Sequence, residues 1–234
     1  MYRPQFNQSL ASAAALLVLA VHQQARALSL SDLTDKDASQ GLKAALEKGA
    51  LAAVGLLGRP DGFLGNPKVR IPLPSFLEDA AKLLKMTGQG RRVNELVTSM
   101  NRAAEAAIPM GKELLVGAVK GMSVTDAKSI PTGGDNSVTQ FFAEKTRQPL
   151  GEKFLPVVTQ ATAKVGLADK YNRVAGKIAN MGLLKSENAN IQQYMTGKSL
   201  DGLYTIIGEE ERKIRQDPVG TGSAILKKVF GVLK

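Results

Sequence analysis

The sequence predicts an all-α protein: a compact multi-helix bundle with one long loop rich in proline and glycine, and no sheet. Apolar residues recur at i, i+3 and i+4 spacing through most of the chain, as they do on the buried faces of helices. The only alternating apolar run, at 68–73, contains and adjoins prolines that prevent normal sheet pairing. No internal repeat or low-complexity tract suggests another architecture.

Glycine and proline separate the first predicted helices. One helix is expected over 41–57, where the sequence 58–60 (Gly-Arg-Pro) ends it. A second is expected to open with a capping box formed by Ser75 and Glu78 and to run to about Met86.

The next helix should cover 91–108. Pro109 is expected to end or kink it before the apolar pattern resumes over 115–122. Asp135 is the predicted N-cap of the helix that follows. Five apolar stripes complete the bundle: 138–142, 154–165, 171–181, 203–214 and 225–230.

Two of these stripes contain a charged residue. Placing residues at 100° steps puts Glu210 at the centre of the 203–214 stripe, and puts Lys145 on the helix face formed by Val138, Phe141 and Phe142. An unpaired buried charge costs several kcal/mol, so we expect both to be buried and paired, with each other or with other polar groups. A structural ion pair, or a lysine whose amine reaches solvent, is favoured over a functional carboxylate in a cleft.

The N-terminus has the pattern of an export signal. Arg3 precedes an apolar stretch at 10–21, and Ala25-Arg26-Ala27 supplies a small-x-small cleavage site. Twelve residues are too few for a membrane span, which needs about 20. We expect residues 1–27 to be a cleavable signal peptide, rather than a buried first helix, and 28–234 to be a single helical domain. The product would be periplasmic, with no transmembrane span and no cysteine to make it a lipoprotein.

Missing residue types exclude many chemistries. The chain has no cysteine and no tryptophan, and its one histidine, His22, lies in the predicted signal. A thiol nucleophile, an imidazole proton shuttle and the usual nitrogen and sulfur metal ligands are therefore absent from the predicted mature chain. We expect no metal and no cofactor.

The charge balance points to anionic partners. The net charge is +10, and it falls to +8 without the two arginines of the predicted signal. A basic exported protein can bind phospholipid head groups, anionic glycans or acidic proteins. Nucleic acid is not expected, because few aromatic side chains are available to stack on bases. Because the charges are spread along the chain, solvated helix faces are the simpler interpretation.

The loop at 58–74 holds the best candidate for anion binding. Arg59, Lys68 and Arg70 lie among its glycines and prolines. Such a loop either packs over the bundle as a belt or is presented for binding. Apolar anchors such as Phe63 favour the belt, with the three cations facing outward.

A second candidate is Thr132-Gly133-Gly134-Asp135, before a predicted helix. Gly133 and Gly134 would let an anion approach free backbone N–H groups. Asp135 competes with such an anion, so a simple capped turn is favoured.

Two further helix faces leave alternatives open. Asn94, Asn101 and Glu105 border the apolar face of 91–108, where they could line a groove but more often bond a neighbouring helix or loop. The basic C-terminal helix over 225–233 could make a peripheral membrane contact, although docking on the bundle is favoured.

Six short segments carry a resemblance to a known family. They are LSLSDL (28–33), PDGFL (60–64), NPKVRIPLP (66–74), SMNRAAE (99–105), TGGD (132–135) and DPVG (217–220). They resemble the exported bacterial family known as domain of unknown function 4197, over nearly all of 28–234. The resemblance implies one helical domain in a Gram-negative envelope. It implies no activity and no site residues.

Two classes of function remain. We favour an exported, non-enzymatic binding or interaction module for an anionic ligand or an envelope partner. The alternative is a hydrolase of glycan or peptidoglycan, which needs two carboxylates about 5 to 10 Å apart. The acids considered for it are Glu105, Asp135, Glu210 and Glu211, and their spacing selects no pair.

Overall fold

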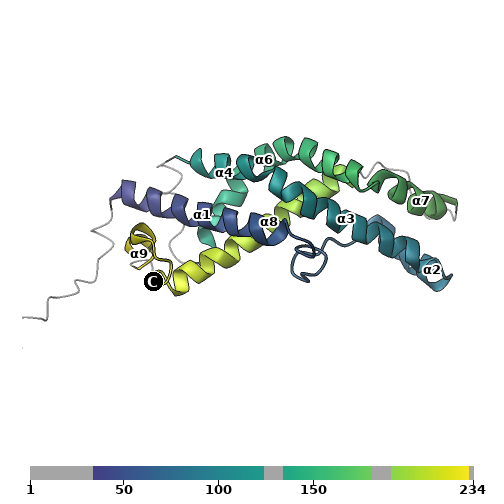
Figure 1. Cartoon of the computed structure of the whole chain (residues 1–234), viewed down its shortest axis with the longest axis horizontal. Helices are drawn as coiled ribbons and strands as arrows, with labels where there is room; N and C mark the ends of the chain where they lie inside the picture. Colours follow the sequence, from purple (N-terminus) through teal and green to yellow (C-terminus); the bar gives the residue numbers. More distant parts are fainter. Residues whose placement is uncertain (1–33, 124–133, 181–190, 232–234) are drawn as a thin grey trace, which may run out of the picture.

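The computed structural model describes residues 34–123, 134–180 and 191–231. Within these ranges the chain forms eight α-helices and no strand, which confirms the all-α prediction. The helices, labelled as in Figure 1, are α1 (Asp35–Leu57), α2 (Ser75–Met86), α3 (Gly90–Met110), α4 (Lys112–Lys120), α6 (Ser137–Lys164), α7 (Leu167–Asn180), α8 (Ile191–Gln216) and α9 (Ala224–Phe230).

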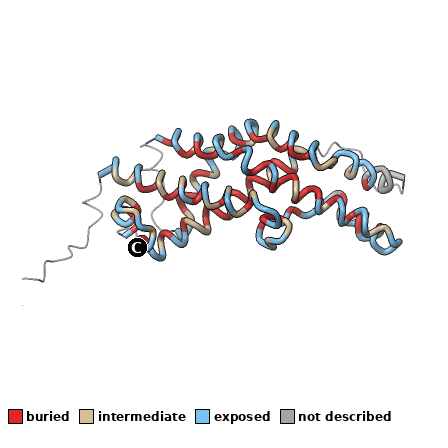
Figure 2. The backbone as a smooth tube through the Cα atoms, viewed as in Figure 1, coloured by how far each residue is buried: buried red, intermediate tan, exposed pale blue. Residues whose placement is uncertain are grey.

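The helices form an elongated bundle around α8. Helix α8 packs most extensively against α1 and α6, and α3 packs against α6 and α7. Helices α2 and α7 lie at one end of the molecule, and α9 packs on α1 at the other (Figure 1). The buried residues follow the inward faces of the long helices (Figure 2).

Helix α1 begins six residues before its predicted start. The Thr34 hydroxyl accepts a hydrogen bond from the Asp37 N–H at 3.1 Å, and Asp37 Oδ2 accepts from the Thr34 N–H at 3.3 Å. This capping box stabilises a polar first turn that an apolar pattern cannot reveal. The helix ends at Gly58, as predicted.

Helix α6 joins two stretches that were predicted as separate helices. It runs without a break from residue 137 to residue 164 and includes Pro149 and Pro156. Both prolines are exposed, so the carbonyl groups that lose their helical partners can bond water. Helix α3 likewise continues through Pro109 and ends at Gly111.

Two predicted N-caps are wrong. Ser75 is the first residue of α2 and makes no capping bond, since Pro74 occupies the cap position. Asp135 does not cap α6, whose cap residue is Asn136, without a side-chain bond. A side chain from α8, described below, satisfies the start of α6 instead.

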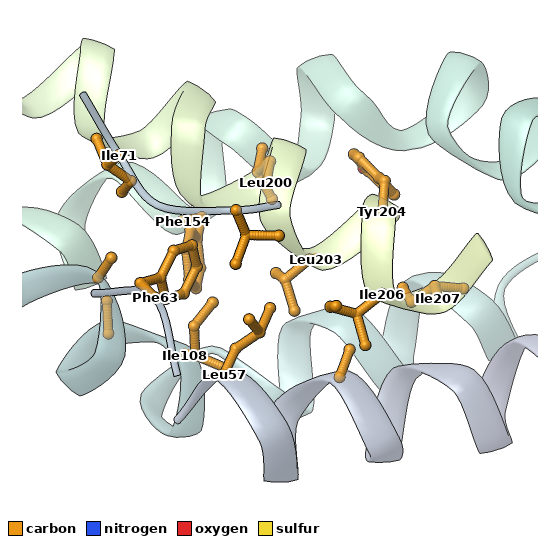
Figure 3. Packing of buried hydrophobic residues seen from close by; sticks show 14 of the residues in the cluster. Leu57, Phe63, Ile71, Ile108, Phe154, Leu200, Leu203, Tyr204, Ile206 and Ile207 are labelled. Carbon is orange, nitrogen blue, oxygen red and sulfur yellow. The ribbon is translucent and has the colours of Figure 1, made fainter. Parts of the chain in front are cut away.

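The loop at 58–74 packs over the bundle as a belt, as favoured. Phe63 and Ile71 are buried in the same hydrophobic cluster as Leu200 and Leu203 of α8 (Figure 3). The Phe63 ring lies so close to Gly202 that a Cβ there would be 2.6 Å from its Cε1. The belt therefore belongs to the hydrophobic core.

Helix α9 is docked on the bundle. Leu226, Val229 and Phe230 are buried, and Lys228 Nζ donates to Asp37 Oδ2 of α1 at 2.7 Å. In this arrangement the apolar face that could meet a membrane contacts α1 instead. None of the helices in the described ranges combines the length and the apolar composition that crossing a bilayer requires.

Candidate functional site

The belt is fixed by the side chain of Asn101 on α3. Asn101 Oδ1 accepts a hydrogen bond from the Ile71 N–H at 2.8 Å, and Asn101 Nδ2 donates to the Ile71 carbonyl at 2.9 Å. Both residues are buried, so these bonds satisfy backbone groups that water cannot reach. Of the two roles considered for Asn101, it bonds a loop and does not line a groove.

Glu105 holds the other end of the belt. Its Oε1 accepts from the N–H groups of Phe63 at 3.1 Å and Leu64 at 3.0 Å, and its Oε2 accepts from Arg102 Nη1 at 2.7 Å. Arg102 also contacts Asp61 in the belt at 2.8 Å. The Glu105 side chain is 5% exposed, so this carboxylate is committed to structure.

Of the three belt cations predicted to bind an anion, one is already paired with a carboxylate. Arg59, Lys68 and Arg70 are all exposed. Lys68 pairs with Glu209 of α8 at 2.5 Å, which ties the belt to that helix. In the part of the chain that the structure describes, Arg59 and Arg70 form no ion pair.

Helix α8 makes another contact with the belt through Tyr194. Its hydroxyl donates to the Pro72 carbonyl at 3.0 Å. A tyrosine hydroxyl is already protonated at neutral pH, and burial raises the pKa of this one further, to about 12.

The predicted buried charges lie elsewhere. Lys145 is exposed, with its ammonium 5.5 Å from the centre of the Phe141 ring. Glu210 pairs with Lys213 at 2.5 Å and its side chain is 19% exposed. The prediction of burial is therefore wrong for Lys145, and the two residues do not pair with each other.

The buried carboxylate of α8 is the next residue, Glu211, at 2% exposure. It lies four residues after Ile207 and three before Ile214, both buried. Glu210 has equivalent spacing, four residues after the buried Ile206 and four before Ile214, so the sequence pattern alone does not distinguish the two acids.

Glu211 caps the start of α6. Its Oε1 accepts from the Val138 N–H at 3.1 Å, and its Oε2 accepts from the N–H and the hydroxyl of Thr139, both at 2.7 Å. Arg215 Nε donates to Oε1 at 2.9 Å, and Arg215 Nη2 also reaches Ser137 Oγ at 2.8 Å. A carboxylate at a helix N-terminus is stabilised by the free N–H groups and the helix dipole.

The predicted anion cradle before α6 is therefore filled from within. Gly133 lies outside the described residues, and Gly134 is exposed in the turn before the helix. Asp135 is exposed and pairs with Arg212 at 3.4 Å. Because Glu211 occupies the N–H groups of α6, the structure shows neither a turn capped by Asp135, which was the favoured interpretation, nor free N–H groups for an external anion at Val138 and Thr139.

A groove of about 700 Å³ lies between α3 and α7. It is lined by Arg91, Asn94, Glu95, Thr98 and Ser99 of α3 and by Lys170 of α7. Lys170 Nζ donates to Ser99 Oγ at 2.6 Å and to the Val165 carbonyl at 2.9 Å. No carboxylate within the described ranges is in ion-pair distance of this ammonium.

A smaller groove, of about 350 Å³, lies between α6 and α8. Gly151 and Gly197 line its two sides, together with Leu155 and Leu200. Its one carboxylate, Glu152, accepts a hydrogen bond from Gln148 at 3.4 Å.

Neither groove holds the pair of carboxylates that a glycoside hydrolase uses. Among the described residues, Glu95 is the one acid that lines the α3–α7 groove, and Glu152 is the one acid that lines the α6–α8 groove. Glu105 and Glu211 already accept hydrogen bonds from backbone N–H groups and from arginines.

Comparison with protein families identifies the chain. Residues 32–231 match the model of the family described as protein of unknown function DUF4197. The chain belongs to the DUF4197 family. The match confirms the resemblance seen in the sequence. The DUF4197 region includes all eight described helices, the belt and both grooves. No match was found among the curated proteins or the solved structures.

Proposed function

We propose that this protein is exported to the periplasm and binds an anionic ligand or partner of the cell envelope without catalysing a reaction. One observation carries the proposal: the buried acids are used internally, while several cations have no acid partner among the described residues. Glu105 and Glu211 are saturated with hydrogen bonds, whereas Arg59, Arg70 and Lys170 form no ion pair there. Such an imbalance attracts anions.

Export is supported by the sequence of residues 1–27, which lie outside the described residues. We expect the protein isolated from the periplasm to begin at Leu28, without a lipid anchor. Intact mass measurement and N-terminal sequencing of protein from fractionated cells test this. A full-length chain recovered from the cytoplasm would contradict it.

Binding is best tested on the mature protein. We expect native mass spectrometry of protein purified gently from its own envelope to retain an anionic molecule. In a direct assay, vesicles containing phosphatidylglycerol or an anionic envelope glycan should bind more tightly than neutral counterparts, with an affinity that falls as salt rises.

The belt cations supply a first variant. Arg59→Ala with Arg70→Ala should weaken binding if the belt faces the ligand. The matched control is Lys82→Gln with Lys213→Gln, which removes the same charge from side chains already paired with Asp79 and Glu210. Equal binding of anionic and neutral probes by the wild type, or release of glycan fragments with turnover, would contradict the proposed function.

A further inference from the structure

We infer that the groove between α3 and α7 is the ligand site, and that its ligand joins one oxyanion to several hydroxyl groups, as a sugar phosphate or a sugar acid does. The inference rests on the proposed function and narrows it to one place and one chemical class. It depends on the residues at the floor of the groove and on those at its rim.

At the floor, Lys170 and Ser99 each keep one hydrogen-bond donor without an acceptor among the described residues. An ammonium has three N–H groups, and Ser99 Oγ and the Val165 carbonyl accept two of them. Ser99 accepts from Lys170, and its own hydroxyl proton has no acceptor in the part of the chain that the structure describes. Ser99 is 5% exposed, which holds this hydroxyl in place. A phosphate or carboxylate oxygen can accept from both groups.

The charge of the floor is uncompensated. Lys170 lacks a carboxylate within 4.0 Å among the described residues, and unlike the exposed Arg59 and Arg70 it is partly buried. A partly buried cation gains most from a counter-ion, because less water screens it. An oxyanion bound there supplies that counter-ion.

The rim contains two neutral polar groups and an Arg91–Glu95 ion pair. Asn94 and Thr98 are exposed and follow one another along the face of α3. Glu95 lies beside them, 3.5 Å from Arg91. An amide, a hydroxyl and a carboxylate together suit hydroxyl groups, since the carboxylate accepts their protons. Arg91, which also lines the groove, balances the charge of Glu95, so Lys170 supplies the net positive charge of the described lining, which suits a ligand with one charged end.

The size of the groove agrees with a small molecule. About 700 Å³ lies within the range of ordinary ligand pockets and far exceeds inorganic phosphate. A lone phosphate would leave the rim groups in water. We therefore expect the hydroxylated part of the ligand to contribute to affinity.

Calorimetric titration of the mature protein tests the ligand class. Glucose 6-phosphate and glucuronate should bind at least about tenfold more tightly than inorganic phosphate or glucose, which each offer half of the chemistry. A uronic acid polymer separates the two sources of this chemistry. Tighter binding of the polymer identifies a glycan, and tighter binding of the monosaccharides identifies a free metabolite. Equal affinity for glucose, glucose 6-phosphate and glucuronate would overturn the inference.

Variants test the place. Lys170→Gln should weaken binding of the sugar acids about tenfold to a hundredfold, the range for a hydrogen bond to a charged group. The control Lys153→Gln removes the same charge from an exposed residue of α6 outside the groove and should bind normally. Thr98→Leu fills the groove from an exposed helical position, so the variant should fold and lose binding even if Lys170→Gln proves unstable.

Two outcomes separate this inference from the proposed function. If Thr98→Leu and a folded Lys170→Gln bind the sugar acids as the wild type does, the groove assignment is overturned and anion binding stands. If the wild type binds none of the sugar acids and no anionic lipid or glycan, both are overturned.

Discussion

The Asn101 side chain pairs with Ile71 as a neighbouring strand would. Its amide oxygen accepts the Ile71 N–H at 2.8 Å and its amide nitrogen donates to the Ile71 carbonyl at 2.9 Å. An extended proline-rich segment has no strand beside it in this part of the fold, and one helical side chain takes that place. The belt is consequently part of the folded core.

Asn101→Ala should destabilise the protein by about 2–4 kcal/mol, because it leaves two buried backbone groups of Ile71 without partners. Urea unfolding followed by circular dichroism measures the loss. Asn94→Ala, at an exposed position of the same helix, should stay within about 0.5 kcal/mol of the wild type. Similar stability of the two variants would contradict the structural role of Asn101.

Glu211→Gln should cost about 3–5 kcal/mol, since it leaves the partly buried Arg215 without its counter-charge. Glu210→Gln should cost less than about 1 kcal/mol, because that residue pairs with an exposed lysine. The two adjacent residues form a matched comparison by thermal or urea unfolding. The prediction fails if Glu210→Gln is the more destabilising change.

Gly202→Ala should cost about 1–3 kcal/mol, because the new methyl group would meet the fully buried ring of Phe63 at 2.6 Å. Gly197→Ala in the same helix should gain up to about 1 kcal/mol, since nothing lies within 4 Å of its added Cβ. Adding Phe63→Leu to Gly202→Ala tests the cause: it should recover part of the loss if the ring causes it.

The contact between α1 and α9 should weaken in acid. Hydrogen bonds from Lys228 and then Thr34 lower the pKa of Asp37 from 3.8 to about 2. A carboxyl whose pKa is lowered by folding stabilises the protein above its unfolded pKa, and that contribution is lost as pH falls through the folded pKa. The stabilisation from Asp37 should therefore disappear between about pH 4 and pH 2.

The Tm difference between wild type and Asp37→Asn measures this contribution. It should be constant above about pH 5 and shrink below pH 4, as both proteins come to carry a neutral side chain at position 37. Asp79→Asn, which removes an exposed carboxylate from α2, should show little difference at any pH. A difference for Asp37→Asn that grows in acid would contradict the assignment.

Helix existence was more predictable than helix boundaries. The apolar stripes within α1, α3 and α8 were identified from spacing alone, because a buried helical face must repeat every three or four residues. Boundaries failed where a proline lies on an exposed helical position, as Pro149 and Pro156 do in α6. There the sequence carries a helix-breaking residue, and solvent on that side accommodates it.

The candidate site was predicted less well. Lys68 was expected to face an anion but pairs with Glu209, and Lys145 was expected to be buried but is exposed. Asn94 lines a groove, which was the less favoured of its two predicted roles, and Lys170 was not singled out. A lysine near the start of α7 becomes distinctive only when Ser99, from another helix, lies 2.6 Å from its amine.

The sequence by itself determined the class of the protein: helical, basic, free of thiols and, after residue 27, of imidazoles, with a belt anchored by apolar residues. Those properties follow from composition and local periodicity, and each of them can be recognised within a single segment of the chain. Tertiary structure alone decided which carboxylates accept hydrogen bonds inside the fold and which described cations lack an acid partner. Glu105 meets Phe63, and Glu211 meets Thr139, across 42 and 72 positions of the chain. Partners so distant are selected by how whole helices pack, and no local pattern specifies them.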